Sequence, residues 1–145
     1  MNDARDDYKV EVVRQLSAPP ARVFAAWRDI ERMRRWFCPT GMTVHRVEVD
    51  FRVGGEYLLQ MQGDTLHTMR GEYREIVPDR RLVFTWCAED FGFHETLVTI
   101  DLTPRGDGTE LRLEHRYFLD DDERARHATG WDACLDHLAA QLPAL

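Results

Sequence analysis

Histidine is the residue type in this 145-residue sequence with the most chemistry to offer, because an imidazole gains or loses a proton near neutral pH. Strand and helix periodicity directs four of the histidines, His67, His94, His115 and His127, toward one concave face. A neutral imidazole presents one donor and one acceptor, so this cluster could bind a polar ligand head, relay a proton or hold a metal ion. For each histidine alone, a hydrogen-bonded or solvated structural role is the competing interpretation.

Metal binding is the chemistry that the spacing of these residues favours least. The sequence has no His-x-x-x-His or His-Glu-x-x-His pair. The cysteines, Cys38, Cys87 and Cys134, are an odd number at wide spacing, which matches neither a disulfide framework nor a zinc-ligand pattern. We therefore predict no metal site and no cofactor.

General acid–base catalysis would need a histidine or carboxylate within reach of an acidic proton on a substrate. Glu95 adjoins His94, but alternation along a strand places these two side chains on opposite faces of the sheet. No Ser-His-Asp or Cys-His arrangement is indicated either. Acid–base work by a cavity histidine therefore remains an alternative to simple ligand binding, and whether the protein is an enzyme stays open.

Large apolar side chains accompany the histidines on the same predicted face. Each of them is more typical of a core than of a ligand contact, but an apolar pocket with a few polar groups is the usual form of a ligand site. The predicted lining of a ligand cavity consists of Trp36, Tyr57, His67, Met69, Tyr73, Trp86, His94, His115, His127 and Trp131.

The elements that must position these side chains are alternating strands followed by one long helix. Turn residues and period-two alternation predict the strands, and an acidic start followed by an apolar stripe (Trp131, Leu135, Leu138, Leu142) predicts the helix. The predicted elements are a strand over 8–16, helices over 20–28 and 30–36, strands over 44–49, 56–62, 66–77, 81–88, 93–103 and 109–117, and a helix from about residue 120.

The fold class that follows is α+β, with one curved antiparallel sheet of six to seven strands and a helix that buries its stripe on the concave face. If Tyr73 faces Phe84 across the Pro78-Asp79 turn, then Gly71 faces Trp86, and the indole could lie over the glycine. We expect a single domain over residues 1–145, with a flexible N-terminus at residues 1–7.

Composition restricts the partners. A formal net charge of −7 argues against a nucleic-acid binder that neutralises phosphates. No apolar run approaches transmembrane length, so we expect no membrane span and a cytoplasmic location. The expected partner is a small apolar or amphipathic molecule, and a sheet edge near residues 43–49 could support a homodimer.

Four segments resemble a known family. They are Ala18 to Trp27, Asp50 to Gly55, Gly71 to Ile76 together with Arg81 to Trp86, and Gly130-Trp131 with Leu135 and Leu138. In their order and spacing they are similar to the START-like (SRPBCC) superfamily, and within it to the proteins named after the activator of the heat-shock-protein-90 ATPase.

The resemblance implies a helix-grip fold with a cavity between sheet and helix, in a family that includes lipid and hormone binders, cyclases and co-chaperone domains. The leading hypothesis is a binding module for a small hydrophobic or amphipathic ligand. One alternative is a cyclase- or isomerase-type enzyme that uses a cavity histidine as acid or base. Another alternative, implied only by the family name, is a chaperone-associated interaction domain.

Overall fold

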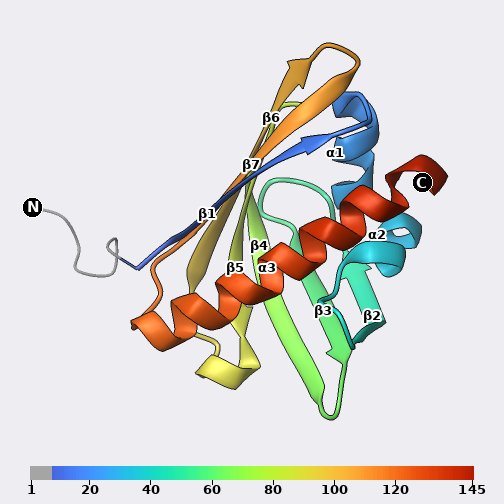
Figure 1. Ribbon diagram of the computed structural model, residues 1–145. Coiled ribbons are helices and arrows are strands. Elements are labelled where there is room, and N and C mark those ends of the chain that lie inside the picture. The colour runs from blue at the N-terminus through green and yellow to red at the C-terminus, as the bar shows by residue number, and fades with distance from the viewer. Residues whose placement is uncertain (1–7) are drawn as a thin grey trace, which may run out of the picture.

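The computed structural model describes residues 8–145. Seven strands form one antiparallel sheet in the order β1-β7-β6-β5-β4-β3-β2, and a long C-terminal helix, α3, crosses one face of it (Figure 1). The elements are β1 (Val10–Leu16), α1 (Pro20–Arg28), α2 (Ile30–Trp36), β2 (Thr43–Val49), β3 (Glu56–Gln62), β4 (Leu66–Val77), β5 (Arg81–Ala88), η2 (Glu89–Phe91), β6 (Thr96–Arg105), β7 (Gly108–Arg116), α3 (Asp121–Gln141) and η3 (Leu142–Ala144). The predicted flexible N-terminus, residues 1–7, lies outside the described residues.

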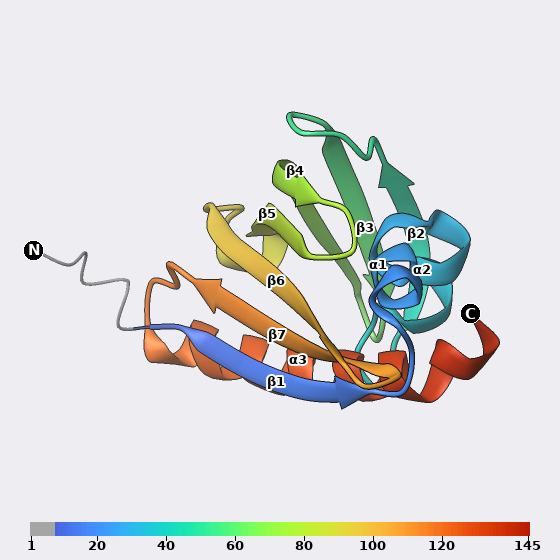
Figure 2. The ribbon, with the colours of Figure 1, turned by 90° about the horizontal axis from the view of Figure 1, so that it is seen from above.

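The sheet is curved, and its helices lie at different places along the curve. Seen from above, the strands bend around from β1 and β7 toward β3 and β2, with α1 and α2 beside that second end (Figure 2). Helix α3 packs beside β1, and α2 packs beside β2. The predicted α+β, helix-grip arrangement is confirmed, with seven strands in the sheet.

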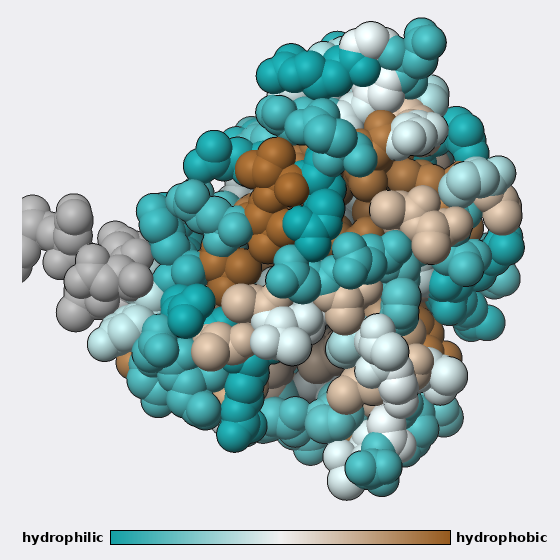
Figure 3. Space-filling view, viewed as in Figure 1, coloured by the Kyte–Doolittle hydropathy of each residue, from teal (hydrophilic) through white to brown (hydrophobic). Residues whose placement is uncertain are grey.

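The apolar stripe of α3 is buried as the sequence predicts. Trp131, Leu135 and Leu138 expose 3%, 0% and 0% of their surfaces, and Leu142, the first residue of η3, continues the stripe with 2% exposed. Burying each such side chain contributes roughly 1.5 to 3 kcal/mol, so this helix is a principal stabiliser of the curved sheet. The helix begins after Asp120, whose side-chain oxygen accepts a hydrogen bond from the Glu123 amide at 2.9 Å. Its opposite face is solvated, and the view onto α3 shows hydrophilic surface around smaller hydrophobic areas (Figure 3).

The strand register is confirmed at Tyr73, which lies opposite Phe84. The ring over Gly71, however, belongs to Tyr57 and not to Trp86. A Cβ at Gly71 would lie 2.5 Å from Tyr57 Cε1 and 2.0 Å from the Thr85 carbonyl oxygen, and the Tyr57 hydroxyl donates to that same oxygen at 2.5 Å. Glycine at 71 therefore lets a tyrosine lie flat across the sheet.

The last part of the sheet differs from the prediction at the start of β6. The sequence predicts a strand from Phe93, whereas β6 begins at Thr96. The chain instead makes the short 3-10 turn η2 and then passes through left-handed backbone at Gly92 (φ 74°) and Phe93 (φ 58°). The apparent alternation through residues 93–95 is therefore wrong as a strand assignment.

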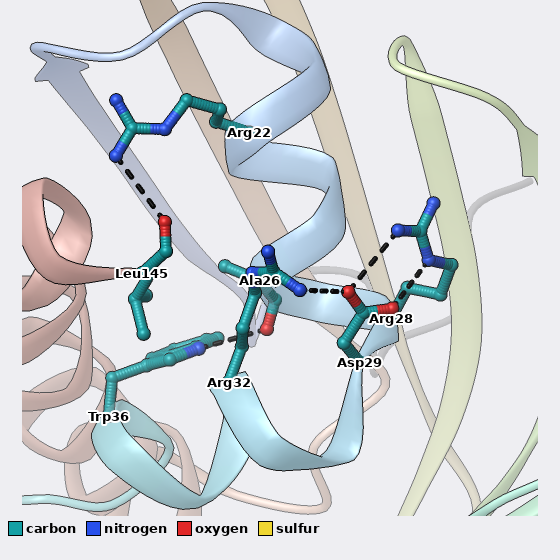
Figure 4. A network of polar contacts seen from close by, with 7 residues as sticks. All are labelled: Arg22, Ala26, Arg28, Asp29, Arg32, Trp36 and Leu145. Atoms are coloured by element: carbon teal, nitrogen blue, oxygen red, sulfur yellow. Dashed lines mark hydrogen bonds and ion pairs between the residues drawn. The ribbon is translucent and has the colours of Figure 1, made fainter.

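The corner between α1 and α2 fixes Trp36 in the core (Figure 4). The Trp36 indole N–H donates to the Ala26 carbonyl oxygen at 2.9 Å, and its side chain is fully buried. At the corner itself the Asp29 carboxylate accepts from Arg28 at 2.7 Å and also from Arg32. The helix pair is thus held by buried aromatic packing on one side and by charged hydrogen bonds on the other.

The outer strands of the sheet are β1 and β2. A bulge between Val44 and Arg46 interrupts the pairing of β2 with β3. The segment 43–49 is thus an edge, as a homodimer through it would require. The homodimer itself stays a prediction.

Candidate functional site

A cavity of about 220 Å³ lies between strands β3, β4 and β5 and helix α3. The loop that follows α2 and the 3-10 turn η2 complete its wall. The wall consists of Phe37, Pro39, Met42, Met61, His67, Met69, Trp86, Ala88, Asp90, Phe91, Arg126, His127, Gly130, Trp131 and Cys134.

Size and polarity limit what this cavity can hold. An apolar cavity of about 150 Å³ accommodates benzene, whereas drug-sized ligands occupy about 300–1,000 Å³. A volume of about 220 Å³ therefore suits a molecule of one or two rings, or a short branched chain. Most of the wall is apolar, with His67, Asp90, Arg126 and His127 as its polar side chains.

Half of the predicted cavity residues lie in this wall. They are His67, Met69, Trp86, His127 and Trp131. Each was placed by the two-residue period of a strand or by the apolar face of the C-terminal helix, and the structure keeps both periods in β4, β5 and α3.

The other predicted cavity residues lie elsewhere. Trp36 is part of the α1–α2 corner, and Tyr57 and Tyr73 line a separate void of about 10 Å³. Burial raises the pKa of both phenols above the ordinary value, and for Tyr57 it is the largest of several causes. His115 is fully buried, and His94 lies in the loop between η2 and β6, outside the wall.

Sequence reasoning missed several wall residues. On α3, Gly130 and Cys134 share a face with His127 and Trp131 at helical spacing, and that spacing was the available signal. Asp90 and Phe91 were missed because they lie in η2, which has no periodicity to read.

His115 is hydrogen-bonded through both ring nitrogens. Its Nδ1 accepts from the Trp131 indole N–H at 2.9 Å, and its Nε2 lies 2.7 Å from the Thr96 hydroxyl. The Thr96 hydroxyl donates its own proton to the Trp86 carbonyl oxygen at 2.5 Å, so the imidazole must donate from Nε2. Burial lowers the pKa of His115 well below its ordinary value, with nearby His127 and His94 as smaller causes. His115 is a neutral, satisfied core residue that orients Trp131.

His127 lies in the cavity wall, and its ring has the opposite donor and acceptor nitrogens from that of His115. Its Nδ1 donates to the Glu123 carbonyl oxygen at 2.8 Å, and its Nε2 accepts from the Trp86 indole N–H at 3.3 Å. Burial lowers the pKa of His127, partly opposed by the hydrogen bond to Glu123. Both indole N–H groups of the wall are therefore satisfied by neutral imidazoles.

Two histidine–carboxylate pairs hold the segment 89–95, which closes one side of the cavity. His67 Nδ1 lies 2.6 Å from Asp90 Oδ2. His94 Nε2 lies 2.8 Å from Glu123 Oε1, a contact outside the angular range of a good hydrogen bond, and its Nδ1 donates to the Phe91 carbonyl oxygen at 2.9 Å. Glu123 exposes only 3% of its surface, and this burial raises the pKa of its carboxyl, opposed by the charge of His94.

Glu95 takes no part in these pairs. Its carboxylate lies 3.2 Å from Arg74 instead. The carboxylate that reaches His94 comes from α3, a partner that residue spacing in the strand region could not indicate.

Within residues 8–145, no group of three or more histidine, cysteine, aspartate and glutamate side chains is arranged to hold a metal ion. Over the same residues, no helix combines the length and the hydropathy needed to cross a membrane.

Comparison with protein families identifies one family. The family model described as Activator of Hsp90 ATPase homolog 1-like protein matches residues 17–142. Among the curated proteins, none matches this chain.

Solved structures resemble this chain over nearly its whole length. Protein CV1439 of Chromobacterium violaceum is 31% identical, with a TM-score of 0.87 over 94% of this chain and 97% of the other. The AHSA1 protein of Silicibacter pomeroyi is 28% identical, with a TM-score of 0.83 over 94% and 98%. CalU16 of Micromonospora echinospora is 29% identical, with a TM-score of 0.75 over 92% and 75%.

Proposed function

Because this chain belongs to the Activator of Hsp90 ATPase homolog 1-like family of START-like domains, we propose that it binds a small apolar or amphipathic molecule between its sheet and α3. The observation that carries the proposal is the cavity of about 220 Å³, which has a mostly apolar wall and four polar side chains. Such a combination is typical of small-molecule sites, where apolar surface supplies affinity and a few polar groups set orientation.

The composition of the wall supports a flat or ring-containing ligand. The rings of Phe37 and Trp86 lie nearly parallel, with an angle of 14° between their planes and 6.2 Å between their centroids. The centroids of the Trp86 and Trp131 rings are 5.2 Å apart. Aromatic faces of this kind pack favourably against other rings in offset or edge-to-face contact. His67 and Arg126 supply hydrogen-bond and charge partners for a polar group on the same ligand.

Gly130 supports the proposal from the side of the helix. A glycine inside a helix costs about 1 kcal/mol relative to alanine, and that cost usually has a packing reason. Here no atom lies within 4 Å of the position that a Cβ at Gly130 would occupy. No tight contact therefore demands glycine at 130, but the missing side chain keeps the cavity wide, since Gly130 is part of the wall.

Native mass spectrometry of the purified protein, followed by denaturing extraction, tests the proposal. We expect a copurified compound of one or two rings at near-stoichiometric amount. Gly130→Leu should abolish this occupancy while the protein remains folded, because position 130 is part of the wall and no atom lies within 4 Å of its Cβ position, so a leucine there should take up cavity volume. Thr129→Leu is the matched control, since Thr129 directly precedes Gly130 in α3, is exposed and lies outside the wall, so its substitution should leave occupancy unchanged. Equal occupancy in the Gly130→Leu variant would place the ligand outside this cavity.

A further inference from the structure

Among the four histidines that the sequence directs toward the concave face, His67 combines a place in the cavity wall with a ring nitrogen, Nε2, whose one contact is a long bond to an exposed threonine hydroxyl. His115 is fully buried, and His94 lies outside the wall. His127 is in the wall, but Trp86 and the Glu123 carbonyl oxygen engage both of its nitrogens. Among these four histidines, His67 is therefore the candidate for an acid–base role inside the cavity.

The contact with Asp90 fixes the tautomer of His67. An ionised carboxylate only accepts hydrogen bonds, so the His67 nitrogen that lies 2.6 Å from Asp90 Oδ2, Nδ1, carries the proton. In the neutral ring Nε2 then bears the free lone pair. Nε2 lies 3.4 Å from the Thr65 hydroxyl, a long hydrogen bond to an exposed residue between β3 and β4, and this hydroxyl can rotate away from the ring.

We propose that His67 is a general base of the cavity, that Asp90 is its positioning residue, and that the substrate class is a one- or two-ring apolar molecule with an acidic C–H at or next to a C=O or C=N group. An imidazole held by a carboxylate through Nδ1, with Nε2 facing a substrate, is the arrangement that general-base catalysis uses in other folds. The inference rests on the proposed binding function, because the substrate must occupy the same cavity.

Removal of a proton leaves a negative charge on the substrate, and the wall contains a cation for it. The Arg126 guanidinium lies over the Phe91 ring, 5.7 Å from its centroid, and its Nε is 3.2 Å from Asp122. Arg126 is largely exposed, so solvent screens its field. Return of the proton from His67 to a different carbon would complete an isomerisation with no co-reactant.

The test uses 5-nitrobenzisoxazole, a bicyclic apolar carbon acid of a size suited to the cavity. His67 Nε2 would take the proton from C3, and the C–H electron pair would complete a C≡N bond. The N–O bond then breaks with its electrons on oxygen, which gives a coloured cyanophenolate, and the imidazolium returns its proton to water. Turnover is followed by absorbance, and binding of the probe is measured separately by native mass spectrometry.

We expect saturable turnover by the wild-type protein and a kcat about 100-fold lower in His67→Gln, with the probe still bound. Asp90→Asn should lower kcat about ten- to a hundred-fold at unchanged KM, because the amide can donate to Nδ1 and so favour the wrong tautomer. His45→Gln is the matched control, since His45 is exposed on β2, outside the wall, and this variant should behave as wild type.

Two outcomes would overturn the inference, and they differ in what else they affect. A probe that binds but reacts equally fast with His67→Gln and wild type removes the base and leaves the binding function intact. A probe that binds at a site unaffected by Gly130→Leu, or does not bind at all, counts against the cavity as a ligand site and against the base together.

Discussion

Indole N–H groups and imidazole nitrogens form matched pairs behind the cavity wall. Trp131 donates to His115, and Trp86 donates to His127. Each accepting nitrogen must stay unprotonated, because a proton there would face another N–H. Burial, the largest cause in both cases, lowers the pKa of His115 and of His127 and so favours the same neutral form.

This arrangement predicts a loss of stability in mild acid. In the unfolded chain both imidazoles take up protons near their ordinary pKa of 6.5, whereas the folded chain resists protonation. The unfolded state therefore binds more protons as pH falls below about 6.5, and the free energy of unfolding decreases by up to about 1.4 kcal/mol per pH unit for each histidine. Urea unfolding at pH 7.5 and pH 5.5 measures the effect.

The variant His127→Gln separates this contribution from those of other groups. Its stability should change less between the two pH values than that of wild type, while His45→Gln should keep the full change. The raised pKa of the Glu123 carboxyl acts in the opposite direction, since a carboxyl of raised pKa costs stability above its unfolded-state pKa and recovers it in acid. A His127→Gln variant whose stability changes between the two pH values as much as that of wild type would contradict the neutral assignment of His127.

Glycines give the clearest contrast at the scale of elements. A Cβ at Gly71 in β4 would collide with the Thr85 carbonyl oxygen and the Tyr57 ring, whereas a Cβ at Gly130 in α3 would meet nothing. The same substitution should therefore have opposite signs in the two elements. Gly71→Ala should destabilise the protein by about 1–3 kcal/mol through overpacking, and Gly130→Ala should stabilise it by about 1 kcal/mol through helix propensity.

Urea unfolding of the two alanine variants checks both signs. A Tyr57→Leu background serves as the control for the strand, because it removes the ring but not the backbone contact, and so should relieve only part of the Gly71→Ala penalty. Destabilisation by Gly130→Ala would show that the helix backbone at 130 packs against something that leaves no room for a methyl group.

Elements with a regular period were predictable from the sequence, and elements without one were not. Both short helices and the strands β3, β4 and β5 have the predicted limits, because alternation and turn residues mark them directly. The η2 turn could not be read, since its three residues and the left-handed positions after it carry no repeating pattern. Because this one segment could not be read, the sequence did not indicate that Asp90 and Phe91 lie in the wall. It also did not indicate that His94 pairs with Glu123 of α3.

The whole molecule uses the same side chains for its core and for its cavity. Trp86, Trp131 and Met69 are at least nine-tenths buried and also line the cavity. Periodicity could therefore predict that these side chains face inward, but not whether a ligand contacts them. Distinguishing a filled core from a cavity requires the volumes of all the facing side chains at once. That information lies in the packing of distant segments and not in local spacing.

Shared use of core and wall predicts that ligand occupancy raises global stability. A molecule that binds only the folded state at 100 times its dissociation constant adds about 2.7 kcal/mol to the free energy of unfolding. Thermal unfolding with increasing amounts of the copurified compound should therefore show a rising midpoint. Gly130→Leu should unfold at a midpoint that the compound does not move, and a shift equal to that of wild type would argue against this cavity.

The placement of the four tryptophans also gives the protein an optical reporter. Trp86 and Trp131 line the cavity, while Trp27 and Trp36 pack against each other in the core, with centroids 4.7 Å apart. Indole emission moves to shorter wavelength when water beside the ring gives way to apolar matter. The entry of a colourless, unlabelled compound can thus be followed by the intrinsic fluorescence of the chain before its chemical identity is known.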